Sequence, residues 1–163
     1  MAEFKYAPEL THARFRSPDI VMNELDEASL FVSGVPFWQE QMFYTKGAGI
    51  MPWHEETDRA CRRLKKHMKV LLEEIETALE NKEKPNPSSV TDALGIFLSI
   101  LFWSNHRPVQ LTDLEEQLKT LEIKPLNLEE RLMYCFDRAH TFLGYTQLKE
   151  LMLEQRKLIA KAE

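Results

Sequence analysis

The chain has 163 residues, of which 44% are hydrophobic and 29% charged, and its formal net charge is -5. This composition excludes a disordered chain, which would have fewer apolar residues and a larger net charge. The length fits one helical domain spanning residues 1–163. A net negative charge also argues against a protein that binds nucleic acid with its whole surface, because such domains are usually basic.

The number of cysteines and the lengths of the apolar runs indicate the cellular compartment in which the protein is expected. Two cysteines, Cys61 and Cys135, suggest no disulfide framework in a chain of this length. Residues 1–10 lack the uninterrupted apolar stretch of a signal peptide. The longest apolar run, residues 93–103, is about half the length needed to cross a bilayer. We therefore expect a cytoplasmic protein without a membrane span.

The first half of the chain predicts two helices joined by an irregular segment. Ser-Pro-Asp at 17–19 is a helix-start signal, because proline is favoured at the first helical position, and a short helix is expected over residues 20–30. Residues 34–53 are rich in aromatic residues, glycine and proline, which is typical of a connection, with one or two helical turns expected over residues 38–44. From His54 to about Asn81 apolar residues recur at spacings of three and four, which predicts an amphipathic helix.

The second half predicts one wholly apolar helix and several amphipathic ones. Residues 89–104 leave no polar face, and such a helix is normally buried on every side. Thr112 and Asn127 are each followed three residues later by glutamate, the capping pattern of a helix start. The last helix is expected over residues 143–161. No run alternates apolar and polar residues, so the predicted fold is all-α: a single-domain bundle of five or six helices around the central helix at 89–104.

A basic stripe is the first candidate functional feature. Arg59, Arg62, Arg63 and Lys66 stand at i, i+3, i+4 and i+7, which places them together on the helix, opposite its apolar face. Such a stripe can meet phosphates or an acidic partner. The alternative is an ordinary solvated face, because acids stand four residues before two of the arginines, the favoured order for helical ion pairs. The like-charged pairs within the stripe have no evident structural benefit, which keeps a binding role open.

A second candidate is a metal site made of His54, Asp58 and Cys61. Their spacing of i, i+4 and i+7 sets them on one edge of a helix, and imidazole, carboxylate and thiolate all ligate zinc. A fourth ligand would come from another histidine or from Cys135, and the spacing selects none. The alternative assigns His54 and Asp58 to the first helical turn and Cys61 to the core as a small apolar residue. No cofactor is expected.

Two further segments have both a functional and a structural interpretation. Lys46–Gly49 is a glycine-containing loop before a helix, where backbone N–H groups can cradle a phosphate, but a turn between aromatic anchors is the favoured interpretation. Trp103–Arg107 places amide, imidazole and guanidinium groups at the end of the most buried helix. These groups suit a binding site, and they suit equally the capping of free carbonyl groups, which we favour.

The runs Leu-Phe-Trp-Ser-Asn-His-Arg-Pro-Val at 101–109 and Pro-Leu-Asn-Leu-Glu-Glu-Arg at 125–131 carry a family resemblance. They resemble the YpoC-like family of small proteins from Gram-positive bacteria, over the second half of the chain. The resemblance implies a bacterial cytoplasmic protein. It brings no activity, cofactor or site residue to this chain.

The leading functional hypothesis is a non-enzymatic interaction module that binds a protein partner or associates with itself. It is based on the aromatic-rich connection and the basic stripe. The alternative from another class is a metal-dependent enzyme that uses His54, Asp58 and Cys61. A weaker alternative is association with nucleic acid through the stripe.

Overall fold

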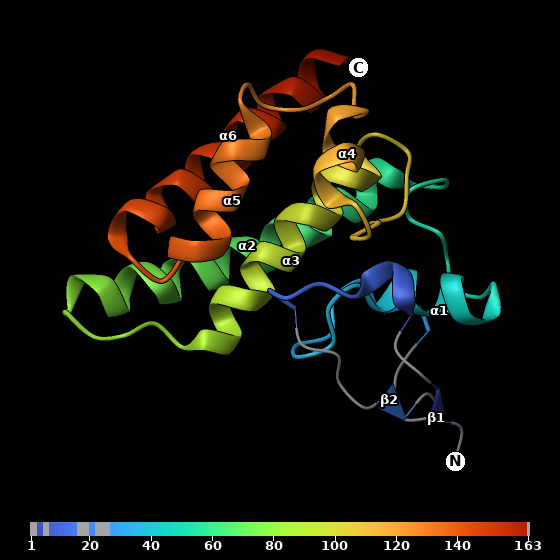
Figure 1. The fold of residues 1–163 in the computed structure, drawn as a ribbon, viewed down its shortest axis with the longest axis horizontal. Helices are drawn as coiled ribbons and strands as arrows, with labels where there is room; N and C mark the ends of the chain where they lie inside the picture. Colours follow the sequence, from blue (N-terminus) through green and yellow to red (C-terminus); the bar gives the residue numbers. More distant parts are fainter. Residues whose placement is uncertain (1–2, 5–6, 16–19, 22–26, 163) are drawn as a thin grey trace.

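Helices dominate the structure, a computed structural model that describes residues 3–4, 7–15, 20–21 and 27–162 (Figure 1). Within these residues the chain forms α1 (Trp38–Lys46), α2 (Thr57–Glu80), α3 (Pro87–Trp103), α4 (Leu114–Lys119), α5 (Leu128–Arg138), α6 (Phe142–Ala162) and a short 3-10 helix η1 (Pro8–Leu10). The predicted all-α bundle is therefore confirmed. Among the described residues, no helix combines the length and the apolar character that a membrane span requires.

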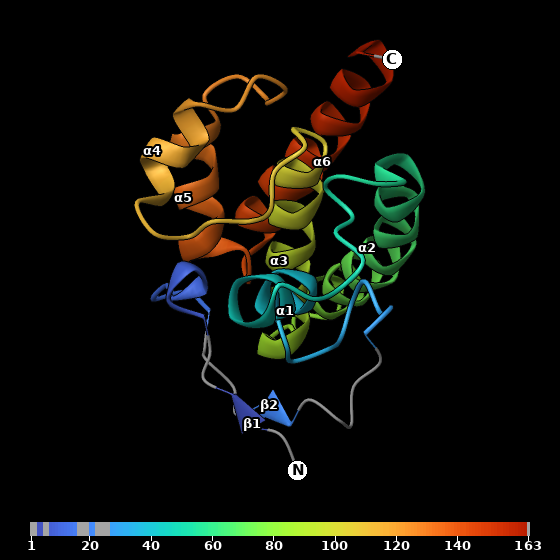
Figure 2. The same cartoon turned by 90° about the vertical axis from the view of Figure 1, so that its right-hand side faces the viewer.

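Helix α3 lies at the centre of the fold, as its apolar sequence predicts (Figure 2). From residue 89 to 103 every residue except Thr91 is buried. The helix start is fixed by Asn86, whose side-chain oxygen accepts a hydrogen bond from the backbone N–H of Ser88 at 2.9 Å. Each large apolar side chain buried here contributes roughly 1.5–3 kcal/mol relative to exposure. The side chains of α3 are therefore a large part of the core.

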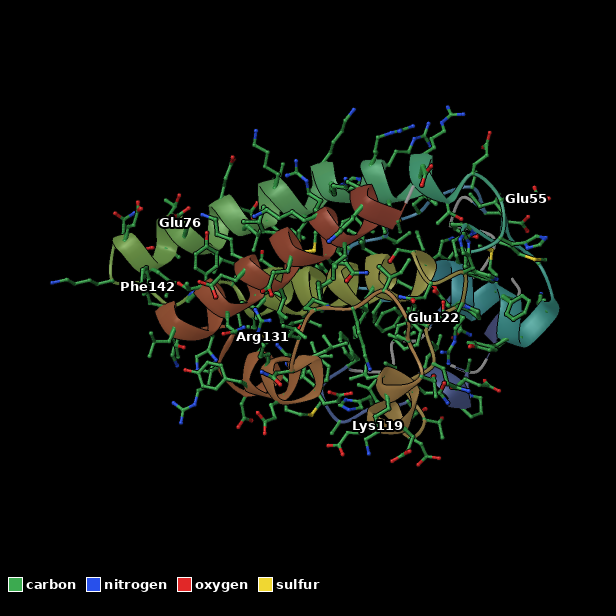
Figure 3. The ribbon with its side chains drawn as sticks, turned by 90° about the horizontal axis from the view of Figure 1, so that it is seen from above. Glu55, Glu76, Lys119, Glu122, Arg131 and Phe142 are labelled. Atoms are coloured by element: carbon green, nitrogen blue, oxygen red, sulfur yellow. The ribbon has the colours of Figure 1, made fainter. Side chains whose placement is uncertain are left out.

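Helices α2 and α6 both pack against α3 and against each other. The buried residues of α2 recur at the helical spacing that the sequence predicts: Ala60, Cys61, Leu64, Met68, Leu71 and Ile75. Figure 3 shows α2 and α6 side by side and antiparallel, because Phe142 at the start of α6 lies beside the end of α2 that contains Glu76. The hydroxyl group of Tyr145 joins the two helices there by donating to Glu76 Oε2 at 3.1 Å.

Helix α5 covers α6 from the other side in a close antiparallel pair. Gly144 permits the close approach, since a Cβ atom at this position would lie 1.8 Å from the carbonyl oxygen of Arg138. Further along, the guanidinium group of Arg131 forms a two-pronged ion pair with the carboxylate of Glu154, which lowers the pKa of Glu154. Helices α5 and α6 are therefore held together by close backbone packing at Gly144 and by the ion pair further along.

The region before α1 differs from the prediction. Ile20–Val21 (β2) pairs antiparallel with Glu3–Phe4 (β1), and residues 27–30 form turns and bends. The short helix predicted over 20–30 is therefore wrong at its described positions, and its start signal at 17–19 lies outside the described residues. Short helices are marginal without a packed face, and strands of two residues are too short to show an alternating pattern.

Several helix starts lie near the predicted positions but use different caps. Asp113 and Asn127 precede α4 and α5 with φ of 52° and 55°, and neither side chain accepts a capping hydrogen bond. The hydroxyl group of Thr112 instead donates to the carbonyl oxygen of Pro8 at 3.4 Å. The predicted capping pairs are therefore wrong, and at Thr112 a contact with η1 takes the place of the local cap. Helix α2 likewise begins at Thr57, three residues later than predicted.

Two phenylalanines provide a matched test of the central position of α3. Phe97 on α3 is 0% exposed, whereas Phe142 at the start of α6 is 61% exposed. We expect Phe97→Ala to lower the free energy of unfolding by about 3–5 kcal/mol, because it removes a buried ring and leaves a cavity. Phe142→Ala should change it by less than about 0.5 kcal/mol. Urea denaturation measures both, and equal effects would contradict the central placement of α3.

Candidate functional site

The basic face of α2 lies on the solvent-exposed surface of the bundle. It is formed by Arg59, Arg62, Arg63 and Lys66. All four residues are exposed, while Ala60, Cys61 and Leu64 between them are buried against α3 and its neighbours. The amphipathic sequence dictates this arrangement, because the apolar stripe must face the core and the charges then point to solvent. The structure therefore brings together on one surface all four residues that the sequence singled out.

The cations of this face have almost no acidic partners. The ion pairs considered from the spacing, four residues apart, do not form. Instead Arg59 lies 3.9 Å from Glu56, an exposed contact that contributes little to stability. Among the described residues, no carboxylate lies within 4.0 Å of the charged groups of Arg62, Arg63 or Lys66. The face is therefore a local concentration of unpaired positive charge in a chain whose net charge is -5.

A groove of about 610 Å³ runs between α2 and α6, next to the basic face. We call it the α2/α6 groove. Its residues on α2 are Lys65, Lys66, Met68, Lys69, Leu72, Glu73 and Glu76, and those on α6 are Tyr145, Lys149, Met152, Leu153 and Arg156. Methionine and leucine side chains form its floor, and charged side chains form its rim. Its volume falls in the range of roughly 300–1,000 Å³ that is usual for ligand sites.

A second hollow, of about 490 Å³, lies where the chain enters α2. It is lined by the segment 49–52, by His54, and by Arg59 and Arg63 of the basic face. Glu55 and Glu56 line it as well, so the two arginines face two carboxylates across the same space. This hollow therefore has no net charge preference, unlike the α2/α6 groove.

Comparison with known proteins identifies the family. A family model described as YpoC-like protein matches residues 58–163, about two thirds of the chain. The chain belongs to the YpoC-like family. The match begins in the first turn of α2 and therefore includes the basic face and every residue of the α2/α6 groove. No curated protein matches the chain, and no solved structure matches it.

The metal site considered from the sequence does not assemble in this YpoC-like protein. His54 precedes the first residue of α2, and Glu56 between them has a left-handed φ of 51°, so the helical spacing of His54, Asp58 and Cys61 is lost. Asp58 is exposed while Cys61 is buried, and burial raises the pKa of the Cys61 thiol to about 12. Among the described residues, no three histidine, cysteine or acidic side chains are grouped so that they could hold a metal ion.

The glycine-containing loop at 46–49 ends α1. Gly47 has a left-handed φ of 62°, and its N–H donates to the carbonyl oxygen of Phe43 at 3.0 Å. The N–H of Ala48 donates to Met42 O at 3.3 Å. These N–H groups satisfy the last carbonyl groups of the helix, so they are not free to hold a phosphate.

The polar groups after α3 connect that helix to the next loop. The side-chain amide of Asn105 donates to the carbonyl oxygens of Leu101 and Ile123, at 2.8 Å each. The guanidinium group of Arg107 donates to Thr120 Oγ1 at 2.7 Å. Asn105 therefore caps a carbonyl group of α3, as the capping interpretation predicts, whereas Arg107 connects the chain after α3 to the end of α4.

Three consecutive buried polar residues of α1 escaped the sequence analysis: Gln39, Glu40 and Gln41. The Gln41 side-chain oxygen accepts a hydrogen bond from the N–H of Ala7 at 2.9 Å. The Gln39 amide group donates to Ser29 O at 2.7 Å. Each residue binds a different part of the chain, so their placement depends on tertiary contacts. The one available signal was a carboxylate within an aromatic-rich segment.

Glu40 joins α1 to the end of α3. Its Oε2 atom accepts hydrogen bonds from the indole N–H of Trp103 at 2.6 Å and from the backbone N–H of Val109 at 3.0 Å. Its Oε1 atom is buried and has no hydrogen-bond partner among the residues that the structure describes. Burial disfavours the charged form and raises the pKa of Glu40 to about 7, although the two hydrogen bonds act in the opposite direction. Burial and the charges of Glu40 and Glu9 together raise the pKa of Tyr44.

The raised pKa of Glu40 predicts a pH dependence of stability. The folded state holds the proton more tightly than the unfolded state, so the free energy of unfolding contributed by Glu40 falls as pH rises from 4.5 to about 7. Glu40→Gln has no such ionisation. As the pH rises across this interval, we expect its free energy of unfolding to increase by about 2–3 kcal/mol relative to that of the wild type. Urea denaturation of both proteins at several pH values measures the difference.

Histidine titration does not obscure this comparison. Burial lowers the pKa of His12, so its contribution to the free energy of unfolding rises with pH. This contribution is the same in both proteins and cancels in the difference. A difference between wild type and Glu40→Gln that stays constant from pH 4.5 to 7.5 would contradict the raised pKa.

The two thiols give a second test of the site. Burial raises the pKa of Cys61 and of Cys135 to about 12, so both are neutral and enclosed at pH 7. We expect neither to react with a thiol reagent in the folded protein, with or without a chelator, and both to react in denaturant. Reaction of Cys61 only after chelator treatment would show that it holds a metal, contrary to the structure.

Proposed function

We propose that this YpoC-like protein is a non-enzymatic interaction module that binds a protein partner through the basic face of α2. The observation that supports it is the exposure of Arg62, Arg63 and Lys66 without a carboxylate within 4.0 Å among the described residues. Such charges are free to meet an acidic surface, which favours both the rate of association and its specificity.

The spacing within the face supports the same proposal. Arg59 and Arg63, and likewise Arg62 and Lys66, are like-charged pairs four residues apart, which destabilise a helix slightly. The one ion pair that this face forms within 4.0 Å among the described residues, between Arg59 and Glu56 at 3.9 Å, is exposed and offsets little of this repulsion. An acidic partner would offset it, so binding relieves an unfavourable interaction as well as forming favourable ones. We further propose that the module works in the bacterial cytoplasm, which the family resemblance suggests.

A photo-crosslinking experiment tests the proposal. A benzophenone amino acid replaces Arg62 in the full chain, and a control chain has it in place of Tyr134, an exposed aromatic residue on α5. We expect the position 62 variant to yield a discrete protein adduct in cells that the position 134 variant does not yield. A label at position 66 should yield the same adduct, and combining that label with Arg59→Ala, Arg62→Ala and Arg63→Ala should abolish it. All replaced side chains are exposed, so the fold is retained.

The outcomes separate the alternatives. An adduct with the mass of two copies would identify the partner as a second copy of the chain, and an adduct with another protein would identify a distinct partner. Adducts formed equally from both labelled positions, or no adduct from position 62, would overturn the proposal. So would an adduct with nucleic acid whose formation falls steeply with salt.

A further inference from the structure

The floor of the α2/α6 groove is apolar and open at its edge. Met68 and Met152 are almost fully buried in it, whereas Leu153 is 48% exposed. Methionine side chains adapt to irregular apolar surfaces and are common where a protein receives varied apolar side chains. Covering Leu153 would remove apolar surface from water at a gain of roughly 25 cal/mol per Å².

The rim of the groove is predominantly basic. Its five cations are Lys65, Lys66, Lys69, Lys149 and Arg156, and its two carboxylates are Glu73 and Glu76. Among the described residues, none of the five cations lies within 4.0 Å of a carboxylate. Glu76 already accepts a hydrogen bond from Tyr145. The free charge along the rim is therefore positive, and it continues into the basic face of α2 through Lys66.

We propose that the α2/α6 groove receives an acidic amphipathic helix of a partner protein. The inference rests on the proposed function and specifies the partner of the same surface. Two antiparallel helices form the groove, and from Lys65 to Glu76 it extends over roughly 16 Å of α2, about three turns of a docked helix. An amphipathic helix lays apolar side chains at i, i+3 or i+4 and i+7 into such a groove. Its acidic flanks then meet the lysines of the rim.

The groove suits nucleic acid less well. A phosphate backbone finds no partner in a floor of methionine and leucine. An acidic helix satisfies both parts of the surface, because its apolar stripe covers Leu153 and its carboxylates pair with Lys65 and Lys69. The observations therefore favour a protein helix.

A pair of designed peptides tests the proposal with the full-length protein. Both are helical, about 18 residues long so that they hold helical structure, and have leucine at i, i+4, i+7 and i+11. One has glutamate at most other positions and the other has lysine there. At low ionic strength we expect the acidic peptide to bind at least about tenfold more tightly than its basic twin in fluorescence polarisation, and to weaken with added salt. Methyl NMR should show Met68 and Met152 shifting, with Met133 on α5 unmoved.

Matched variants locate the binding. Leu153 lines the groove, whereas Val70, 56% exposed on α2, lies outside it. We expect Leu153→Glu to weaken binding of the acidic peptide at least about tenfold and Val70→Glu to change it less than about twofold. Both positions are exposed, so both variants should fold.

Each remaining outcome counts against the groove. Absence of binding, equal binding of the basic peptide, displacement of the acidic peptide by duplex DNA, or equal effects of the two variants would overturn the inference. The proposed function of the basic face is tested separately from the groove. If the adduct from position 66 is retained in the Leu153→Glu chain but lost in the triple alanine chain, the basic face binds a partner and the groove does not.

Discussion

The complete burial of α3 is the constraint on which the rest of the structure depends. A helix without a polar face must be covered on every side, so α2, α6 and the segments before α1 and after α3 all pack around it. Helices α2 and α6 turn their apolar stripes toward this common centre as well as toward each other. Their charged sides point outward, and a groove with an apolar floor remains where the two helices meet.

Burial of apolar surface also brings polar groups into the interior, where each needs a partner. The end of α3 shows how these partners are found: Trp103 donates to Glu40, and Asn105 connects α3 to the loop at Ile123. The buried amide of Gln155 on α6 donates to Ser104 Oγ at 2.9 Å. Within the described residues, Glu40 Oε1 and Gln155 Oε1 are both buried without a hydrogen-bond partner, and burial raises the pKa of Glu40 to about 7. The packing of α1 against the end of α3 therefore depends on the protonation state of Glu40.

The outer surface follows a different principle from the interior. In a chain with a net charge of -5, the cations on α2 and α6 stand out, while Glu154 pairs with Arg131 and Glu76 accepts a hydrogen bond from Tyr145. The family match, residues 58–163, spans the helices that carry these cations and leaves out α1 with its buried polar residues. The surface that we propose for partner binding therefore lies entirely within the part of the chain shared with the YpoC-like family.

The sequence by itself determined the helices of the core and the basic face, since both follow from periodicity: apolar residues at 89–104 on every side, and Arg59 to Lys66 opposite a regular apolar stripe. Local caps were predicted wrongly at Thr112, where a contact with a distant segment replaces the local hydrogen bond, and at Asn127, whose side chain makes no capping hydrogen bond. Only the tertiary structure decided that α2 and α6 form one groove and that Glu40 meets Trp103. Both depend on residues more than 60 positions apart in the chain, whose proximity is set by packing around α3 and leaves no periodic signal.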